Sequence, residues 1–256
     1  MTNSLVLNHF GFLELSGEDS KKFLQGYTTC NLETLTPEKA QIGAICDIQG
    51  RVITSFLLLE TKGKLILRMS KDLLEKTLKF LSKYIVFSKA EIRDISDELF
   101  CHGVDVSEAS FMHVKPLESG LEIDLGNRRE LWLNQKQSNE EMCLKDWTDL
   151  EIDLSHSWIS SENSQVFLPQ SLNYHEIDAL DFEKGCYLGQ EIIARMHFRG
   201  KLKKRLHLIN EPIVGLKDGV LISQGRKKTL AVLKNTSGQP IEVMNQENRR
   251  VLAQPI

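Results

Sequence analysis

Two apolar, partly β-branched runs, residues 42–46 and 52–60, flank a turn that contains Gln49 and Gly50. Short apolar runs on either side of a glycine turn predict a β-hairpin. A third run, residues 65–69, follows a turn of four polar or glycine residues and predicts a third strand.

Helices are predicted on both sides of this hairpin unit. Leucines at helical spacing predict a helix over residues 70–82, with Ser70 as its N-cap. Ser16 and Asp19 have the spacing of a capping box before a shorter helix that Gly26 would end. Further strands are expected at residues 5–7, 11–15, 90–93 and 100–104. Strands arranged around helices in this order predict a layered α+β fold, and no glycine-rich dinucleotide or P-loop motif is present.

The hydrophobic pattern of the sequence changes in the second half of the chain. Residues 107–164 are polar and weakly patterned, and they predict only a hairpin of residues 121–124 and 131–133. After Arg205, turn residues separate five short strand-like runs, at 205–209, 219–223, 229–233, 241–244 and 250–253. This spacing predicts a small all-β barrel or sandwich. We therefore expect an α+β region at residues 1–205 and a β-barrel at residues 206–256, packed on each other.

Charge and hydropathy narrow the function classes. The 256 residues carry a formal net charge of -3, which argues against a surface built entirely for nucleic acid. The N-terminus lacks the basic start and apolar stretch of a signal peptide, and the longest apolar run, residues 56–59, is far too short to span a membrane. We expect a cytoplasmic protein with no membrane partner. Five cysteines without a CxxC pair predict reduced thiols and no metal site.

The segment around Cys186 is the strongest candidate for chemistry. Gly185 and Gly189 bracket this cysteine, and glycines permit positive φ or close approach of a ligand. Residues 190–197 have helical character, with Glu191 and Arg195 on one face. A neighbouring Lys184 and a helix N-terminus favour the thiolate, as a nucleophile, redox thiol or metal ligand requires. A tight turn around a buried cysteine is the alternative, and the roles of Tyr187 and His197 stay open.

Basic residues follow directly. Between positions 195 and 205 the chain has no acidic residue and six basic ones: Arg195, Arg199, Lys201, Lys203, Lys204 and Arg205. A cluster of one sign predicts an anionic ligand, such as a phosphate, a polyglutamate or an RNA backbone. An exposed basic strand without a ligand is the alternative reading.

The run from Lys184 to Glu191, continued by Arg195 and residues 198–201, resembles the K-G-C-[YF]-x-G-Q-E-x-x-x-R signature of the YgfZ-type branch of the aminomethyltransferase superfamily. Four other landmarks resemble the same family, at residues 16–26, 44–51, 83–89 and 168–173. Together the landmarks span about three quarters of the chain, and residues 107–164 match poorly.

The resemblance implies two α+β subdomains and a C-terminal β-barrel around a central tetrahydrofolate pocket. It implies an accessory role for iron–sulfur enzymes, including those that thiomethylate tRNA, and hence an indirect link to tRNA. Cys186 would be the key thiol. The folate-binding residues implied are Asn31, Lys184, Tyr187, Gln190, Glu191, Arg195 and Arg199, with Lys184 and Arg199 near the folate or its glutamate tail.

Two positions depart from the family pattern. Asn31 stands where relatives often carry Asp, so hydrogen bonding is kept and the charge is lost. Thr54 and Ser55 stand where the glycine-cleavage aminomethyltransferase has its catalytic Asp, and a hydroxyl is neutral at pH 7. We therefore do not expect glycine-cleavage activity. Two alternative functions remain: a folate-dependent one-carbon transferase acting on an unknown amine, and a tRNA-binding module.

Overall fold

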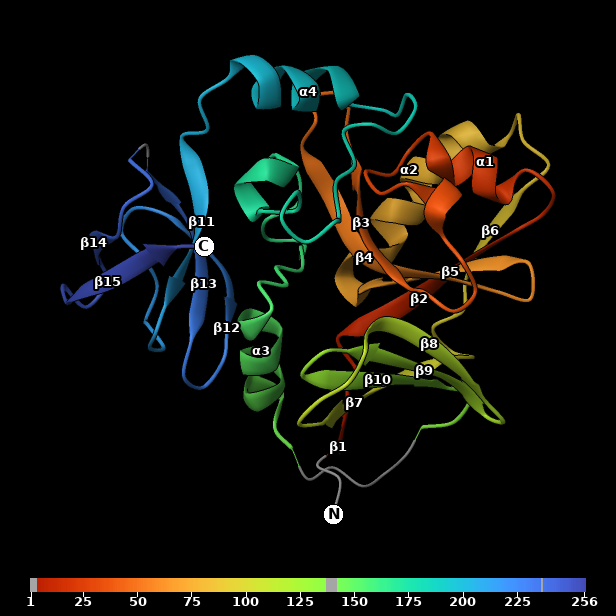
Figure 1. The fold of residues 1–256 in the computed structure, drawn as a ribbon, viewed down its shortest axis with the longest axis horizontal. Coiled ribbons are helices and arrows are strands. Elements are labelled where there is room, and N and C mark those ends of the chain that lie inside the picture. The colour runs from red at the N-terminus through yellow and green to blue at the C-terminus, as the bar shows by residue number, and fades with distance from the viewer. Residues whose placement is uncertain (1–3, 137–141, 236) are drawn as a thin grey trace.

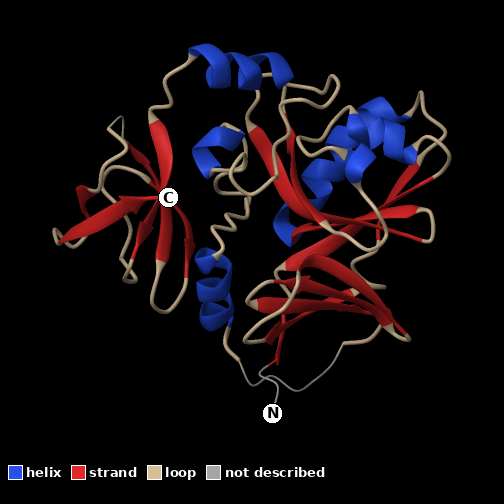
Figure 2. Cartoon of the chain, in the orientation of Figure 1, coloured by secondary structure: helices blue, strands red, loops and turns tan. Residues whose placement is uncertain are grey.

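Three antiparallel sheets of five strands each organise the residues that the computed structural model describes, which are 4–136, 142–235 and 237–256. Two of the sheets lie side by side, and the third stands apart on the other side of the molecule (Figure 1). Helices cover one face of the first sheet and bridge the gap to the third (Figure 2). This arrangement confirms the predicted α+β class.

The first sheet contains the predicted hairpin and the strand after it. Its order is β3-β4-β5-β2-β6, with bounds Gln41–Cys46, Val52–Thr61, Lys64–Ser70, Phe10–Ser16 and Glu91–Asp94. Helices α1 (Ser20–Gln25) and α2 (Leu74–Ile85) lie against it (Figure 1). Their apolar residues, among them Leu24 and Leu81, join one buried cluster with Leu13, Leu58 and Met69 from the strands.

The helix starts differ from the prediction. Helix α1 begins at Ser20, and Asp19 at its N-cap position makes no side-chain capping bond, so the capping box on Ser16 was wrong. The Asp19 carboxylate instead accepts a hydrogen bond from the backbone N–H of Lys89, at 2.8 Å. Ser70 likewise makes no capping bond, and a 3-10 turn, η2 (Lys71–Leu73), comes before α2.

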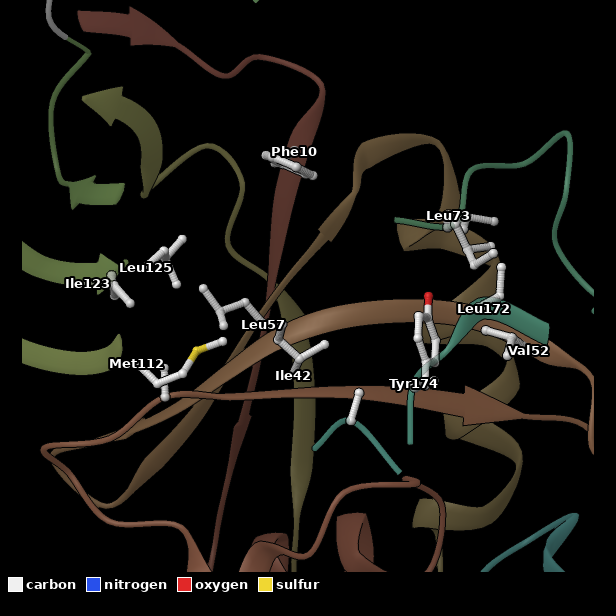
Figure 3. Close-up of a cluster of buried hydrophobic side chains, with 14 of the residues drawn as sticks. Phe10, Ile42, Val52, Leu57, Leu73, Met112, Ile123, Leu125, Leu172 and Tyr174 are labelled. Atoms are coloured by element: carbon white, nitrogen blue, oxygen red, sulfur yellow. The ribbon is translucent and has the colours of Figure 1, made fainter. Parts of the chain in front are cut away.

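The second sheet supplies most of the remaining core. Its order is β1-β7-β10-β9-β8, with bounds Ser4–Val6, Phe100–Asp105, Arg128–Leu133, Gly120–Leu125 and Phe111–Leu117. The pairing of β9 with β10 confirms the predicted hairpin, whereas β8 was not assigned from the sequence. Figure 3 shows side chains of both sheets in one cluster: Met112, Ile123 and Leu125 from the second sheet, and Ile42 and Leu57 from the first.

A buried ion pair joins these two sheets. Arg68 on β5 and Glu130 on β10 are both fully buried, and the Arg68 Nη2 lies 2.8 Å from the Glu130 carboxylate. The Arg68 guanidinium lies 3.8 Å from the centroid of the Phe10 ring and 4.1 Å from that of Trp158. The two aromatic rings favour the cation, so the ion pair forms a buried polar contact between the sheets.

The third sheet confirms all five strands predicted after Arg205. Its order is β12-β13-β11-β15-β14, with bounds Val220–Gln224, Thr229–Lys234, Lys204–Ile209, Arg250–Pro255 and Ile241–Met244. Strands β12 and β14 end the described order, so a closed barrel stays a prediction, as does the division at residue 205. Helix α3 (Leu144–Asp153), which the sequence did not predict, fastens this sheet: the Asp149 carboxylate accepts the backbone N–H groups of residues 226–228.

Helix α4 (Gln190–Arg199) runs from the first sheet toward the third and leads into β11 (Figure 1). It confirms the helix predicted after the cysteine. Two short 3-10 turns, η1 (Leu32–Thr34) and η3 (Pro169–Leu172), complete the elements. In the part of the chain that the structure describes, no helix combines the length and apolar character needed to cross a membrane.

Candidate functional site

Lys184 anchors the loop that carries Cys186. Its side chain is only 5% exposed, and its ammonium donates to the backbone carbonyls of Gln25 at 2.8 Å and of Thr28 and Cys30 at 2.7 Å. Burial lowers the pKa of Lys184 to about 8, although nearby Cys30 and an acidic neighbour favour the charged form. The ammonium therefore ties the signature loop to the chain just after α1.

Two glycines allow the same loop to touch the β3–β4 turn. Gly189 has φ +84°, and a Cβ added there would lie 2.5 Å from the Asp47 carbonyl oxygen and 3.0 Å from the Cα of Gly50. Gly50 itself has φ +73°, and a Cβ added there would lie 3.0 Å from the Ile193 side chain of α4. The N–H of Leu188 also donates to the carbonyl of residue 26, at 3.0 Å. Three segments with family-like sequence thus form one contact unit.

Cys186 lies on the outside of this unit. The thiol residue is exposed, and a Cβ added at the preceding Gly185 would meet no atom within 4 Å. Next to it, Tyr187 is buried, and burial raises the pKa of its hydroxyl. Gln190 closes the loop through a 3.5 Å contact from its Nε2 to the Lys184 carbonyl. The arrangement holds the backbone on both sides of Cys186 and leaves the cysteine open to approach.

A pocket of about 680 Å³, here called the central pocket, lies beside this loop. Four parts of the chain line it: residues 31–42 around η1 and the start of β3, residues 111–112 of β8, residues 177–183 before the signature, and residues 197–198 at the end of α4. The pocket is therefore formed jointly by the first sheet, the second sheet and α4. Its volume falls in the range of sites for small organic ligands.

Aromatic rings form one wall of the central pocket. The rings of Phe182 and His197 stack with their centroids 3.8 Å apart, and Phe198 meets Phe182 edge-on at 6.4 Å. Phe111 contributes from β8 on the second sheet. A stacked pair at a pocket wall presents a flat apolar face of the kind that binds a planar ring.

The lining also contains polar groups. Two hydrogen bonds hold the side chain of Asn31. Its Oδ1 accepts from Gln25 Nε2 at 3.0 Å and from the backbone N–H of Glu33 at 3.1 Å. Asp178 and Glu183 add exposed carboxylates. A third carboxylate, Asp181, is already engaged because it accepts the N–H groups of residues 183 and 184. The pocket thus combines apolar faces with hydrogen-bond acceptors.

The structure brings together only part of the predicted residue set. Asn31 lines the central pocket, whereas the lining includes none of Lys184, Cys186, Tyr187, Gln190, Glu191, Arg195 and Arg199. Glu191, Arg195 and Arg199 are exposed along α4. Sequence reasoning did not select Phe182, Phe111 or Asp178. Phe182 lies two positions before the signature, and this proximity was the one feature of the sequence that could have identified it as a pocket residue.

The two hydroxyl residues that follow the Gln49–Gly50 turn, Thr54 and Ser55, belong to the core. Thr54 and Ser55 on β4 are buried, and the Ser55 Oγ accepts the backbone N–H of Ile159 at 2.9 Å. Ser55 therefore fastens the segment that follows α3 to the first sheet.

Comparison with known proteins gives two kinds of likeness. The tRNA-modifying protein YgfZ of Colwellia psychrerythraea is 30% identical over 236 residues, which cover 83% of this chain and 72% of that protein. The tRNA-modifying protein YgfZ of Vibrio atlanticus is 28% identical over 225 residues, which cover 80% of this chain and 70% of that protein. No protein-family model matches the chain.

Among solved structures, the glycine cleavage system aminomethyltransferase T of Bartonella henselae superposes with a TM-score of 0.72. The match covers 99% of this chain and 84% of that one at 11% identity, so it shows a shared fold. This confirms the aminomethyltransferase-like fold that the signature predicts. The sequence likeness to the Colwellia psychrerythraea protein, at 30% identity over 72% of that protein's length, shows that the chain belongs to the YgfZ family.

Proposed function

We propose that this chain is a cytoplasmic folate-binding accessory protein that supports iron–sulfur enzymes and tRNA modification, with Cys186 as its key thiol. The central pocket carries the proposal, because its stacked Phe182 and His197 rings and its acceptor groups suit a pterin. The family relatives are named tRNA-modifying proteins, which supports the link to tRNA.

The lining suits tetrahydrofolate in chemical detail. The pyrimidine edge of a pterin carries an amino group and an N–H side by side, and both donate to carboxylates such as Asp178 or Glu183. The ring would stack on Phe182. Arg199, exposed at the end of α4 next to Phe198, would attract the glutamate carboxylate of the folate.

The residues predicted from the sequence fall into two groups: those that hold the signature loop in place and those that would contact the ligand. Lys184 already donates to three carbonyls, so we assign it to the position of the loop. Tyr187 is buried beneath the Lys184 ammonium, whose Nζ lies 5.1 Å from the ring centroid. Gln190 contacts the Lys184 carbonyl and closes the same loop. Glu191 and Arg195 would contact the ligand from the exposed face of α4. The proposal includes a small C-terminal β-barrel of residues 206–256, packed on a folate-binding region of residues 1–205.

The decisive measurement is calorimetric titration of the purified chain with tetrahydrofolate and folinic acid. We expect binding that weakens about tenfold, or about 1.4 kcal/mol, in Phe182→Leu, which keeps apolar bulk but removes the stacking ring. Phe87→Leu is the matched control, because this ring is 93% exposed and does not line the central pocket. Equal affinity in both variants would show that the pocket is not the folate site.

Cys186→Ser separates binding from function. Because Cys186 does not line the central pocket, we expect its variant to bind folate as the parent chain does. The same variant should fail to restore thiomethylated nucleosides in tRNA of cells that lack the protein. Normal tRNA modification in those cells would contradict the thiol role.

A further inference from the structure

A second pocket of about 450 Å³, here called the basic groove, borders the central pocket, since His197 lines both. Lys201, Lys203 and Arg205 contribute three cations to it, and no carboxylate lines it among the described residues. Gln170 of η3 lies on its wall. The basic cluster seen in the sequence therefore surrounds a hollow surface, where a cation cluster attracts anions.

Three buried polar atoms of the groove lack hydrogen-bond partners in the described chain: Gln170 Oε1, His175 Nδ1 and Arg205 Nε. Gln170 is 4% exposed, and its orientation is fixed because its Nε2 donates to the Ile193 carbonyl at 2.7 Å. An unpaired buried polar atom costs about 1–3 kcal/mol, so three in one pocket indicate a ligand that pairs with them.

The tautomer of His175 follows from its neighbour. Its Nε2 lies 3.3 Å from the exposed Glu176 carboxylate, and burial lowers the pKa of the imidazole, with Arg205 and His197 acting in the same direction and Glu176 against. A neutral ring that donates from Nε2 leaves Nδ1 as an acceptor. The groove thus offers two acceptors, on Gln170 and His175, beside three cations.

This combination requires a ligand whose anionic groups alternate with hydrogen-bond donors. RNA has it, because phosphates alternate with ribose 2′-hydroxyls that donate. A γ-glutamyl chain also alternates carboxylates with amide N–H groups. Phe198 favours RNA: it lines the central pocket one residue from His197, yet it is 72% exposed on the last turn of α4, so its ring can also stack an unpaired base, whereas a glutamyl chain has no ring to stack.

We propose that the basic groove binds the sugar–phosphate backbone of tRNA directly, with Phe198 as a stacking surface for an unpaired base. The inference rests on the proposed function for the relevance of tRNA and deepens it by replacing an indirect link with a contact. Lys201, Lys203 and Arg205 neutralise phosphates, and Gln170 and His175 accept from ribose hydroxyls.

Fluorescence anisotropy with a labelled tRNA transcript, over a series of KCl concentrations, tests this contact. The variant K201A/K203A/R205A should bind more than about tenfold more weakly at moderate salt, and its salt slope should fall by about one unit for each cation removed. The matched control K22A/K71A/K83A removes three exposed lysines from the surface around α1 and α2, and it should bind as the parent does. Circular dichroism verifies that each variant is folded.

A second variant tests the acceptors separately from the charge. His175→Phe should reduce the preference for an RNA stem-loop over a DNA stem-loop of the same sequence, while the salt slope stays unchanged. An unchanged preference would contradict the assigned role of His175 as a hydroxyl acceptor.

Other outcomes overturn the inference as a whole. These are the absence of tRNA binding by the parent chain, or equal binding by the groove and control variants. If the groove variant keeps tRNA but no longer binds polyglutamate folate more tightly than monoglutamate folate, the groove holds the folate tail instead. Absent folate binding together with groove-dependent tRNA binding would refute the proposed function and leave this inference standing.

Discussion

Alanine at Gly189 and at Gly185 should have opposite effects, although the two glycines flank the same cysteine. At Gly189 the added Cβ meets the Asp47 carbonyl at 2.5 Å and the residue must keep φ +84°. The left-handed conformation costs about 1–2 kcal/mol for an L side chain, and the clash with backbone adds about 1–3 kcal/mol. The smaller entropy of the unfolded chain offsets about 0.4–1 kcal/mol. We expect Gly189→Ala to lower the free energy of unfolding by about 2–4 kcal/mol.

Gly185→Ala is the matched control from the same loop. Its Cβ would enter open space and its φ is not positive, so only the unfolded-state effect remains. This variant should therefore be unchanged or more stable by up to about 1 kcal/mol. Urea unfolding followed by circular dichroism measures both. Equal losses in the two variants, or no loss in Gly189→Ala, would refute the close contact between the signature loop and the β3–β4 turn.

Three further predictions follow from buried polar groups. Lys184→Met should lower the free energy of unfolding in urea by about 2–4 kcal/mol, because the three carbonyls that the ammonium binds lose their donor. Lys83→Met, at an exposed position, should leave this free energy nearly unchanged. Asp149→Ala should lower the free energy of unfolding by about 1–3 kcal/mol, because three backbone N–H groups lose their acceptor. Asp146→Ala, which removes only a surface ion pair, should lower it by less than about 1 kcal/mol. Equal losses in the two variants would contradict this docking of α3. Burial and Arg68 lower the pKa of His9 from 6.5 to about 4, so the unfolded chain takes up the proton first as the pH falls. Stability should therefore drop between pH 6.5 and 4, and a His9→Phe chain that drops as steeply would contradict this origin.

Local patterns identified the elements whose signals lie within a few residues. The five strands of the third sheet were predicted because turn residues, several of them glycines, separate them, and the β3–β4 hairpin because of the turn at Gln49 and Gly50. The start of α1 was misassigned because Asp19 is satisfied by the N–H of Lys89, seventy residues away. Helix α3 was missed because acidic side chains such as Asp149 and Glu151 are buried on it, which obscures its amphipathic pattern.

The basic residues that line the groove were recognised as one cluster because they are neighbours in the chain, whereas contacts between residues far apart in the sequence were missed. The exposure of Cys186 was not predicted, and its role, like the roles of the other site residues named from the sequence, stays a prediction. The stacking of Phe182 on His197 spans a turn and most of a helix, so no local pattern signals it. Lys184 was expected beside a ligand, yet its ammonium binds carbonyls of residues that precede it by more than 150 positions.

The anchoring of the Cys186 loop also sets the order in which the protein is assembled. The loop rests on residues 25–30 and 47–50, so it has no partner surface until those segments have folded and the later half of the chain has been synthesised. Contacts of such long sequence separation form late, because their loop-closure entropy must first be overcome. A chain released early from the ribosome would lack the anchored loop, and the backbone around Cys186 would be held in place only in completed molecules.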